Sequence, residues 1–373
     1  MTDAYVIGIG MTRFTKHEAD DVELGAQAVA AALADAGIGT GEVDALYAGH
    51  VHGGMVAGER VGAETGLAGI PTINVENACA SGTTAVIEAV HAVRSGRFDC
   101  VVACGFEKVS DRKGMITPAE GDYEGALGLV FPAWHAMRAR LYMNEFGLTR
   151  EQLSLVAVKN RHNGALNPLS HWKEEVSVED VGASREIASP LRLYDCCPKS
   201  DGGAAVVITS KRPDGRAIVI HGTGLASGRA DGNYEALFED VTARAARAAY
   251  DEAGIEPDDV DFAEVHDCFT IAEGMRVEGL GLAKQGTYFR QLEEGRWSMD
   301  GETPINASGG LLAKGHPLGA TGVGQLCEVA TQMRGAAGER QLARTKVGVA
   351  HTRGGSVPGT EGGSCGVLVC VSE

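Results

Sequence analysis

Short apolar runs alternate with alanine-rich amphipathic segments along most of the chain. The runs at 100–105, 204–209, 346–351 and 365–371 are continuously hydrophobic, which is typical of strands that are covered on both faces. The segments between such runs place alanine and leucine at helical spacing and end at glycine. This alternation predicts an α/β fold.

One pattern of this kind occurs twice. Residues 22–50 read VELGAQAVAAALADAGIGTGEVDALYAGH, and residues 241–266 read VTARAARAAYDEAGIEPDDVDFAEVH, so that Gly37 aligns with Gly254. A second match relates the tetrapeptide at 79–82 to the one at 319–322, each at the head of a helical segment. Repeats at half-chain distance predict a duplication into two similar domains, unlike the short period of a solenoid.

A more polar stretch separates the two halves. We expect residues 1–114 with 190–215 to form the first half, 216–373 the second, and 115–189 an insertion over the site. The insertion carries basic residues, and a solvated charged face is the favoured interpretation for any one of them: Arg138, Arg140, Lys159, Arg161 and Lys173.

Charge and cysteine content narrow the functional class. A formal net charge of −17 argues against a general nucleic-acid binder, which relies on lysine and arginine to neutralise phosphates. No apolar run approaches the ~20 residues that cross a bilayer, so no membrane association is expected. The nine cysteines form no CxxC pair and no secretory leader is recognisable, which favours reduced thiols in the cytoplasm.

Cys79 lies in the sequence NACASGTTAVIEAV, where a loop of small residues becomes a helix. Small neighbours would allow a ligand to approach the thiol, and unpaired N–H groups at a helix start favour the thiolate. A buried structural cysteine fits the same position, because free cysteine is often buried. Both interpretations remain open at this point.

Two further motifs carry polar chemistry. His316 lies in NASGGLLAKGHPLGATGVG, where rigid Gly and Pro neighbours would fix an imidazole able to accept a thiol proton, although a solvated turn histidine is the simpler alternative. His266, Asp267 and Cys268 are consecutive in EVHDCFT. This tripeptide lacks the ligand spacing of a structural zinc site, so we expect no metal.

Together these motifs resemble those of the thiolase superfamily, and especially its sterol-carrier-protein-type and archaeal branch. NACASGTTA is similar to the family's nucleophile loop, HDCF replaces the Asn-Glu-Ala-Phe of ordinary thiolases, GGLLAKGHPLGATG is similar to the histidine loop, and CCPKSDGGAAVVIT (196–209) resembles the segment that closes the first half. The resemblance spans nearly the whole chain. It implies two βαβαβαββ-type halves packed as five layers, α-β-α-β-α.

The resemblance also implies thiolytic cleavage or Claisen condensation of a 3-ketoacyl-CoA through an acyl-cysteine. Cys79 would be the nucleophile, His316 its base and an oxyanion ligand, Cys268 the acid/base, and His266 a second oxyanion ligand. The backbone N–H of Cys79 and that of Gly354 or Gly355 would form the acyl oxyanion hole. Coenzyme A would be a co-substrate, and some of the basic residues of the insertion could contact its phosphates. No bound cofactor is expected.

One motif departs from the ordinary family pattern. Residues 349–359 read VAHTRGGSVPG and lack the catalytic cysteine of the usual Cys-x-Gly motif. In the HDCF branch Cys268 is expected to take that role. The remaining cysteines are predicted to be packed thiols: Cys100, Cys104, Cys196, Cys197, Cys327, Cys365 and Cys370.

Partners and alternative functions follow from the same resemblance. It implies a homodimer or tetramer, and association with a zinc-ribbon/OB-fold acyl-CoA-binding protein and with hydroxymethylglutaryl-CoA synthase. The alternatives are a thiolase-fold aldolase or CoA-independent acyltransferase, and a non-catalytic acyl-CoA or lipid carrier. A dinucleotide-binding oxidoreductase, suggested by the GIG at residues 8–10, is disfavoured because the full G-x-G-x-x-G is absent.

Overall fold

The computed structural model describes residues 2–114, 123–215, 217–229, 241–358 and 360–373. Residues 115–122, which begin the predicted insertion, and residue 216, the first of the predicted second half, lie outside the described residues.

Nine strands of the described chain form one sheet, in the order β3-β2-β4-β7-β1-β8-β11-β10-β9. The first half contributes β1 (Tyr5–Met11), β2 (Ala45–Gly49), β3 (Thr72–Val75), β4 (Cys100–Glu107) and β7 (Gly202–Thr209). The second half contributes β8 (Ile218–Ser227), β9 (Phe262–Glu264), β10 (Val347–Gly354) and β11 (Ser364–Ser372). The halves join where β1 pairs with β8 at Tyr5 and Val219.

The sheet repeats its own design on either side of that junction. Moving outward, β1, β7, β4 and β2 correspond to β8, β11, β10 and β9. The strand directions also correspond, because β7 runs antiparallel to both neighbours, as does β11, while β2 is parallel to β4 and β9 is parallel to β10. The predicted duplication is therefore confirmed in the strand order and the strand directions.

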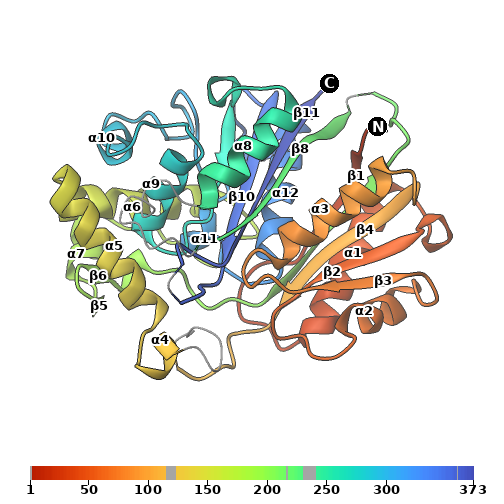
Figure 1. Ribbon diagram of the computed structural model, residues 1–373, viewed down its shortest axis with the longest axis horizontal. Coiled ribbons are helices and arrows are strands. Elements are labelled where there is room, and N and C mark those ends of the chain that lie inside the picture. The colour runs from red at the N-terminus through yellow and green to blue at the C-terminus, as the bar shows by residue number, and fades with distance from the viewer. Residues whose placement is uncertain (1, 115–122, 216, 230–240, 359) are drawn as a thin grey trace.

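Helices complete the layers around this sheet (Figure 1). The outer helices of the first half are α1 (Asp21–Ala36) and α2 (Ala57–Thr65), and α8 (Val241–Ala253) packs on β8 and β11. Between the halves lie α3 (Ser81–Arg94) and α12 (Thr321–Met333), which contact each other and strands of both halves. The contacts follow the expected order α-β-α-β-α, with the two β layers joined at one edge.

Local sequence explains the close packing of α1 on the sheet. The helix begins after Asp20, whose side chain accepts a hydrogen bond from the Glu23 N–H, and ends at Gly37 with φ of 68°. A Cβ on Gly8 or Gly10 of β1 would overlap carbonyl oxygens of α1. The GIG sequence therefore serves helix–strand packing, which removes the reason for considering a dinucleotide-binding loop.

The segment between the halves forms its own helical layer, at the left of Figure 1. Its described elements within the predicted bounds of 115–189 are α4 (Tyr123–Ala126), α5 (Phe131–Phe146), α6 (Arg150–Leu166), α7 (Val178–Ala183) and β5 (Glu186–Ala188). The strand β6 (Leu191–Arg192), which pairs with β5, and the 3-10 turn η2 (Leu193–Asp195) lie just past that boundary, in residues assigned to the first half. The segment packs against α9 (Thr270–Gly279), α10 (Tyr288–Glu293) and α11 (Gly310–Ala313) of the second half. Among the described residues, the other 3-10 turns are η1 (Thr40–Glu42), η4 (Pro257–Asp259) and η5 (Gly338–Arg340).

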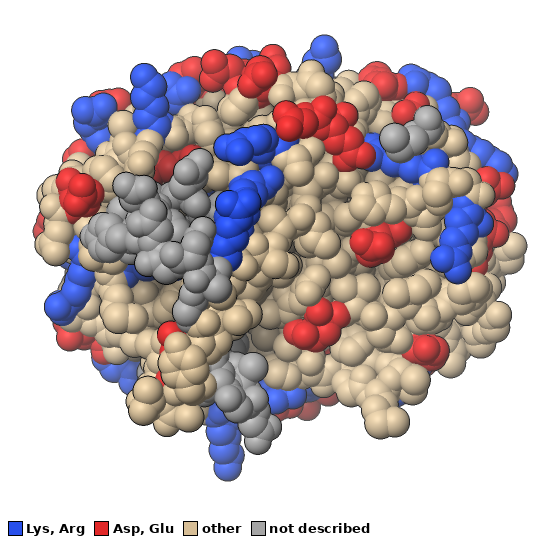
Figure 2. All heavy atoms as spheres, in the orientation of Figure 1, with Lys and Arg blue, Asp and Glu red and all other residues tan. Residues whose placement is uncertain are grey.

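On the face shown in Figure 2, acidic and basic residues are interspersed near the rim and the centre is largely uncharged. Among the described residues, none of the helices has the length and apolar character needed to cross a membrane.

Candidate active site

Cys79 lies in the tight turn that leads from β3 to α3. Ala78 adopts φ of 48°, a conformation that side-chain-bearing residues rarely take. The turn is held because Ser81 Oγ accepts the Asn77 N–H at 2.9 Å and donates to the Ala78 carbonyl at 2.6 Å. The helix begins at Ser81 with Ala80 as its N-cap, so Cys79 precedes the first helical turn. The sequence predicts a thiol where the loop becomes a helix, and the structure places it two residues before the first helical residue, outside the first turn.

The end of β10 closes over this turn. A Cβ on Gly354 would lie 2.8 Å from the Cys79 nitrogen, so only glycine permits the approach. The next residue, Gly355, has φ of 67° and directs its N–H to the Cys79 sulfur. Of the two predicted oxyanion-hole glycines, Gly355 thus presents its N–H at the thiol, while Gly354 occupies the ladder position opposite Ser364.

His316 lies between α11 and α12, and its ring orientation is fixed. Its Nδ1 is 2.7 Å from Thr321 Oγ1, and that hydroxyl donates its own hydrogen to the Pro317 carbonyl at 2.8 Å. The hydroxyl oxygen must therefore accept from Nδ1–H, which leaves the other ring nitrogen, Nε2, with a free lone pair. An imidazole in this tautomer is suited to act as a base.

His266 follows β9 and faces His316. The two ring centroids are 4.9 Å apart with an interplanar angle of 85°. Within the described part of the chain, His266 Nδ1 is buried without a hydrogen-bond partner. A buried polar atom of this kind is costly unless a ligand or water completes it, so this ring is available to bind a substrate oxygen.

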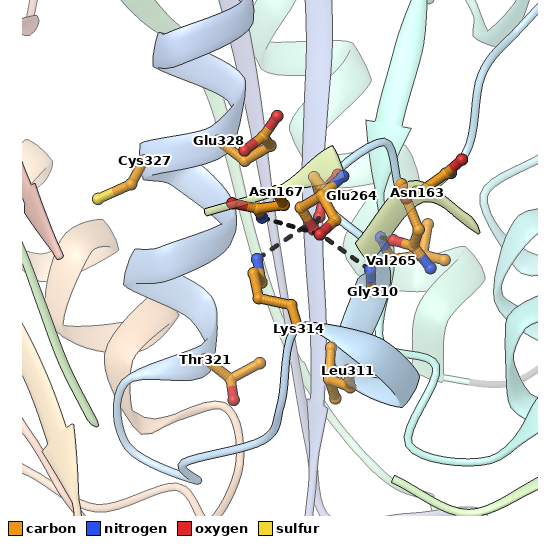
Figure 3. A network of polar contacts seen from close by, with 12 residues as sticks. Asn163, Asn167, Glu264, Val265, Gly310, Leu311, Lys314, Thr321, Cys327 and Glu328 are labelled. Carbon is orange, nitrogen blue, oxygen red and sulfur yellow. Dashed lines mark hydrogen bonds and ion pairs between the residues drawn. The ribbon is translucent and has the colours of Figure 1, made fainter. Parts of the chain in front are cut away.

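A buried polar network joins the segment that carries His266 to the segment that carries His316, and Figure 3 shows part of this network. Glu264, two residues before His266, accepts hydrogen bonds from the backbone N–H and hydroxyl of Ser308. Lys314, two residues before His316, places its Nζ 3.7 Å from the Glu264 carboxylate, and both side chains are 1% exposed. This ion pair therefore fixes the spacing of the segments that carry the two imidazoles.

Two more contacts join the same segments. The Asn306 side chain accepts the Val265 N–H at 2.8 Å, and Asp267 accepts the N–H of Leu311 at 2.6 Å, at the start of α11. Asp267 thus has a structural partner on the histidine loop, which explains the acidic residue at the centre of the HDCF motif.

Cys268 shares a cavity with the other predicted site residues. The cavity encloses about 310 Å³, and Cys79, His266, Cys268, His316 and Gly355 all line it. One donor atom from each of Cys79, His266 and His316 lies within 4.8 Å of the others. These atoms are of kinds that zinc also binds, and the expectation that no metal takes part stays a prediction.

Burial sets the electrostatics of the site. The pKa of His316 is lowered to about 3 by desolvation, and that of His266 lies well below its ordinary value, so both rings are neutral near pH 7. The pKa of Cys79 is raised by burial and by the nearby Cys268 and Glu107, although the N–H of Gly355 opposes the shift. The backbone N–H groups of Cys79 and Gly355 do favour the thiolate, but burial outweighs them in the resting site. Cys79 needs a base.

Family models match both halves of the sequence. Residues 4–212 match the thiolase N-terminal domain, and residues 229–360 match the thiolase C-terminal domain-like model. The chain belongs to the thiolase family. The family is one of acyltransferases, and the chain is accordingly an enzyme of that class.

Individual relatives agree with this assignment. The chain is 38% identical over 374 residues to acetyl-CoA acetyltransferase of Methanothermobacter thermautotrophicus, covering 95% of this chain and 97% of the relative. It is 35% identical over 385 residues to sterol carrier protein 2 of Bos taurus, covering 94% and 70%. The predicted sterol-carrier-protein and archaeal branch is thereby confirmed.

A solved structure has the same fold. The Ltp2-ChsH2(DUF35) aldolase superposes with a TM-score of 0.85 at 27% identity, covering 99% of this chain and 98% of the matched chain.

Sequence reasoning missed several residues that line the thiolase cavity. Cys196 and Cys197 were predicted to be packed, yet both are half-buried and line the cavity, because the Cys197 N–H donates to the Cys268 carbonyl at 3.0 Å. The other five predicted packed thiols are buried: Cys100, Cys104, Cys327, Cys365 and Cys370. The cavity wall also includes residues from three separate elements: Trp134, His135, Arg276 and Arg353.

Three basic residues of the insertion, Arg138, Lys159 and Arg161, are buried and do not lie on a solvated face. Lys159 is buried in an ion pair with Glu273, at 3.1 Å. The Arg138 guanidinium is buried and lies 3.4 Å from the centroid of Trp134. The Nε of Arg161 donates to the Glu174 carbonyl at 2.9 Å. The Arg138 and Lys159 side chains serve internal packing and are unsuited to bind coenzyme A phosphates at the surface.

Proposed function

We propose that this thiolase-family enzyme catalyses Claisen condensation and thiolytic cleavage of a 3-ketoacyl-CoA through an acyl-Cys79 intermediate. The observation that carries the proposal is the convergence of Cys79, His266, Cys268 and His316 on one cavity, with the Gly355 N–H directed at the Cys79 sulfur. Coenzyme A is the co-substrate in this reaction.

In the cleavage direction, His316 Nε2 takes the Cys79 proton and the sulfur attacks the keto carbonyl. The oxyanion that forms accepts hydrogen bonds from the N–H groups of Cys79 and Gly355, and such a donor contributes ~3–4 kcal/mol in comparable enzymes. The Cα–Cβ bond then breaks, and the two imidazoles hold the enolate oxygen while Cys268 protonates the carbon. Coenzyme A finally takes the acyl group: its thiol proton goes to the Cys268 thiolate, its sulfur attacks the acyl carbonyl, and Cys79 leaves as a thiolate that recovers its proton from His316.

The cavity walls are mainly apolar, with Phe131, Trp134 and Phe269 among them. This lining suits the acyl part of the substrate, which the proposal leaves at the level of a 3-ketoacyl-CoA.

Three further properties belong to the proposal. The nine free thiols favour a reducing compartment such as the cytoplasm. We expect a homodimer or tetramer, which light scattering would measure. The structurally similar aldolase is named together with a second, DUF35 component, and this supports testing an acyl-CoA-binding partner protein.

CoA-dependent cleavage of acetoacetyl-CoA and of a longer 3-ketoacyl-CoA, with and without a candidate partner protein, tests the function. Cys79→Ala should abolish cleavage, whereas Cys100→Ala, which changes a buried cysteine away from the cavity, should leave it intact. Full activity in the Cys79→Ala enzyme would refute an acyl-Cys79 mechanism.

A second candidate function is retro-aldol cleavage of a 3-hydroxyacyl-CoA, because a relative of similar structure is named an aldolase. Retro-aldol cleavage needs no acyl-enzyme. Cleavage of a 3-hydroxyacyl-CoA that survives the Cys79→Ala change would favour this reaction over thiolysis.

A further inference from the structure

His135 of α5 faces Cys268 from the insertion side of the cavity. Its Nε2 lies 3.7 Å from the Cys268 sulfur, within hydrogen-bonding distance for a thiol. Its Nδ1 lies 3.0 Å from the Phe131 carbonyl oxygen, one turn earlier in the same helix. A carbonyl can only accept, so Nδ1 carries the hydrogen and the neutral ring presents a lone pair at Nε2 to the thiol.

The ring of His135 is held in this orientation by aromatic neighbours. It stacks on Phe269, the residue after Cys268, with centroids 4.2 Å apart and an interplanar angle of 27°. Trp134 packs edge-on against the same ring, with the two ring centroids 4.8 Å apart. Because His135 is 5% exposed, water competes little for its Nε2. The geometry thus joins one imidazole to one thiol in a preformed hydrogen bond.

This hydrogen bond answers a chemical difficulty in the proposed function. Burial raises the pKa of Cys268 to about 12, so that on its own only ~10⁻⁵ of the thiol would be ionised at neutral pH. A thiolate is nevertheless needed to remove an α-proton from acetyl-CoA. Burial lowers the pKa of His135 well below its ordinary value, so the ring is neutral at rest and its Nε2 lone pair is free to accept the thiol hydrogen bond. The same burial opposes charging of the ring, so the proton moves only because the imidazolium and the thiolate form next to each other and attract.

We infer that His135 is the proton acceptor for Cys268, and that the two act as a pair in the carbon–carbon step. The inference rests on the proposed function of Cys268. Other titratable or charged groups that face this pair or influence it electrostatically are Cys79, Arg138, Cys196, Cys197, His266, Asp267, Arg276, His316 and Arg353.

With His135 and Cys268 acting together, every proton moved during condensation is accounted for. The thiol proton moves from Cys268 to His135 Nε2, and the thiolate takes an α-proton of acetyl-CoA to give the enolate. The enolate carbon attacks the carbonyl of acyl-Cys79, the carbon–sulfur bond breaks, and Cys79 leaves as a thiolate. Cys268 then gives its proton to Cys79, and His135 returns the first proton to Cys268.

Alkylation of Cys268 by iodoacetamide tests the pair without requiring turnover. The experiment uses a Cys79→Ser background, with Cys196 as an internal reference for access to the same cavity, and peptide mass mapping as readout. His135→Phe keeps a ring to stack on Phe269 but removes Nε2. We expect Cys268 alkylation to fall at least about tenfold relative to Cys196, since a positioned base contributes ~10²–10⁴.

The matched control is His162→Phe, which changes an exposed histidine on α6 and should leave the ratio unchanged. His135→Gln serves as a second variant if His135→Phe does not fold, because a neutral amide cannot take up the proton. An unchanged Cys268 to Cys196 ratio in a folded variant would overturn the inference.

Two half-reactions, measured in the enzyme with Cys79 intact, separate a proton acceptor from a structural residue. His135→Phe should lose exchange of acetyl-CoA α-hydrogens with deuterated water while still forming acyl-Cys79. Parallel loss of both would indicate a structural role and contradict the inference. If the wild-type enzyme itself showed no exchange, the proposed function would fail, yet the alkylation ratio would still decide whether His135 activates Cys268.

Discussion

Replacing Lys314 with methionine removes the cation that faces the buried Glu264 carboxylate (Figure 3). Methionine has a similar length and no charge, so the change tests the ion pair with little loss of volume. Glu264 keeps its hydrogen bonds from Ser308 but loses its only ion-pair partner among the described residues.

The distance of 3.7 Å between Lys314 Nζ and the Glu264 carboxylate sets the expected loss of stability. At an effective dielectric constant of ~20, two unit charges at this distance attract by about 4 kcal/mol. Removing one partner of a buried pair costs about 3–5 kcal/mol in other proteins, which agrees. For a chain of 373 residues, with an unfolding entropy of about 0.8 kcal/mol/K, the thermal midpoint should fall by about 4–6 °C.

The loss of stability in Lys314→Met should also depend on pH. Burial raises the pKa of Glu264, and Lys314 opposes that shift, so the pKa rises further in Lys314→Met. A carboxyl with a raised folded-state pKa contributes stability that is present at low pH and is lost as pH increases through that pKa. The difference from wild type should therefore be smaller near about pH 5 than near about pH 8.

Thermal unfolding followed by circular dichroism measures these effects. Lys284→Met, at an exposed lysine, is the matched control and should change stability by less than about 0.5 kcal/mol. The double variant Glu264→Gln/Lys314→Met should be less destabilised than the sum of the two single variants, because no charge is then left buried. A Lys314→Met enzyme as stable as the control at both pH values would refute this reasoning.

Three more predictions concern the interior and the site. Gly82→Ala should destabilise the protein severely, because a Cβ there would overlap the Gly319 carbonyl oxygen between α3 and α12. The control Gly182→Ala, in α7, meets no atom within 4 Å and should be neutral. Chemical denaturation of both variants measures the difference in stability. Burial raises the pKa of Glu107 from 4.5 to about 7. The protonated carboxyl therefore contributes about 3 kcal/mol to folding stability at low pH, and this contribution should be lost as pH rises through 7. Glu107→Gln should accordingly show a flatter profile of thermal midpoint against pH. Cys268→Ala should still form acyl-Cys79 but lose carbon–carbon bond formation, and equal loss of both half-reactions would contradict the separate roles of the two thiols.

Much of the fold could be predicted because its signals are local in the sequence. Apolar runs and helix-period alanines identify the strands and the outer helices, and the repeat near Gly37 and Gly254 indicates the duplication. Both glycines end their helices with positive φ, as the pattern implies. The join of the two half-sheets through Tyr5 and Val219 has no such signal, because a single residue pair between distant strands leaves no periodicity.

The site residues also fall into those that have a local signal in the sequence and those that do not. Cys79 and His316 could be singled out because small residues and glycines surround each in the sequence, and Cys268 because it belongs to the HDCF motif. His135 could not, because it lies on an ordinary helix and gains its importance from contact with a residue 133 positions away. The raised pKa of Cys79 could not be predicted either, because burial dominates it and depends on the packing of the whole molecule.

Peptide mass mapping after incubation with acetyl-CoA tests the central claim most directly, since it shows which thiol in the shared cavity receives the acyl group. The account predicts a single acetyl group on the peptide that contains Cys79, in the wild-type enzyme and in Cys268→Ala, and none in Cys79→Ser. Acetylation of another cysteine, or an adduct that persists in Cys79→Ser, would contradict it.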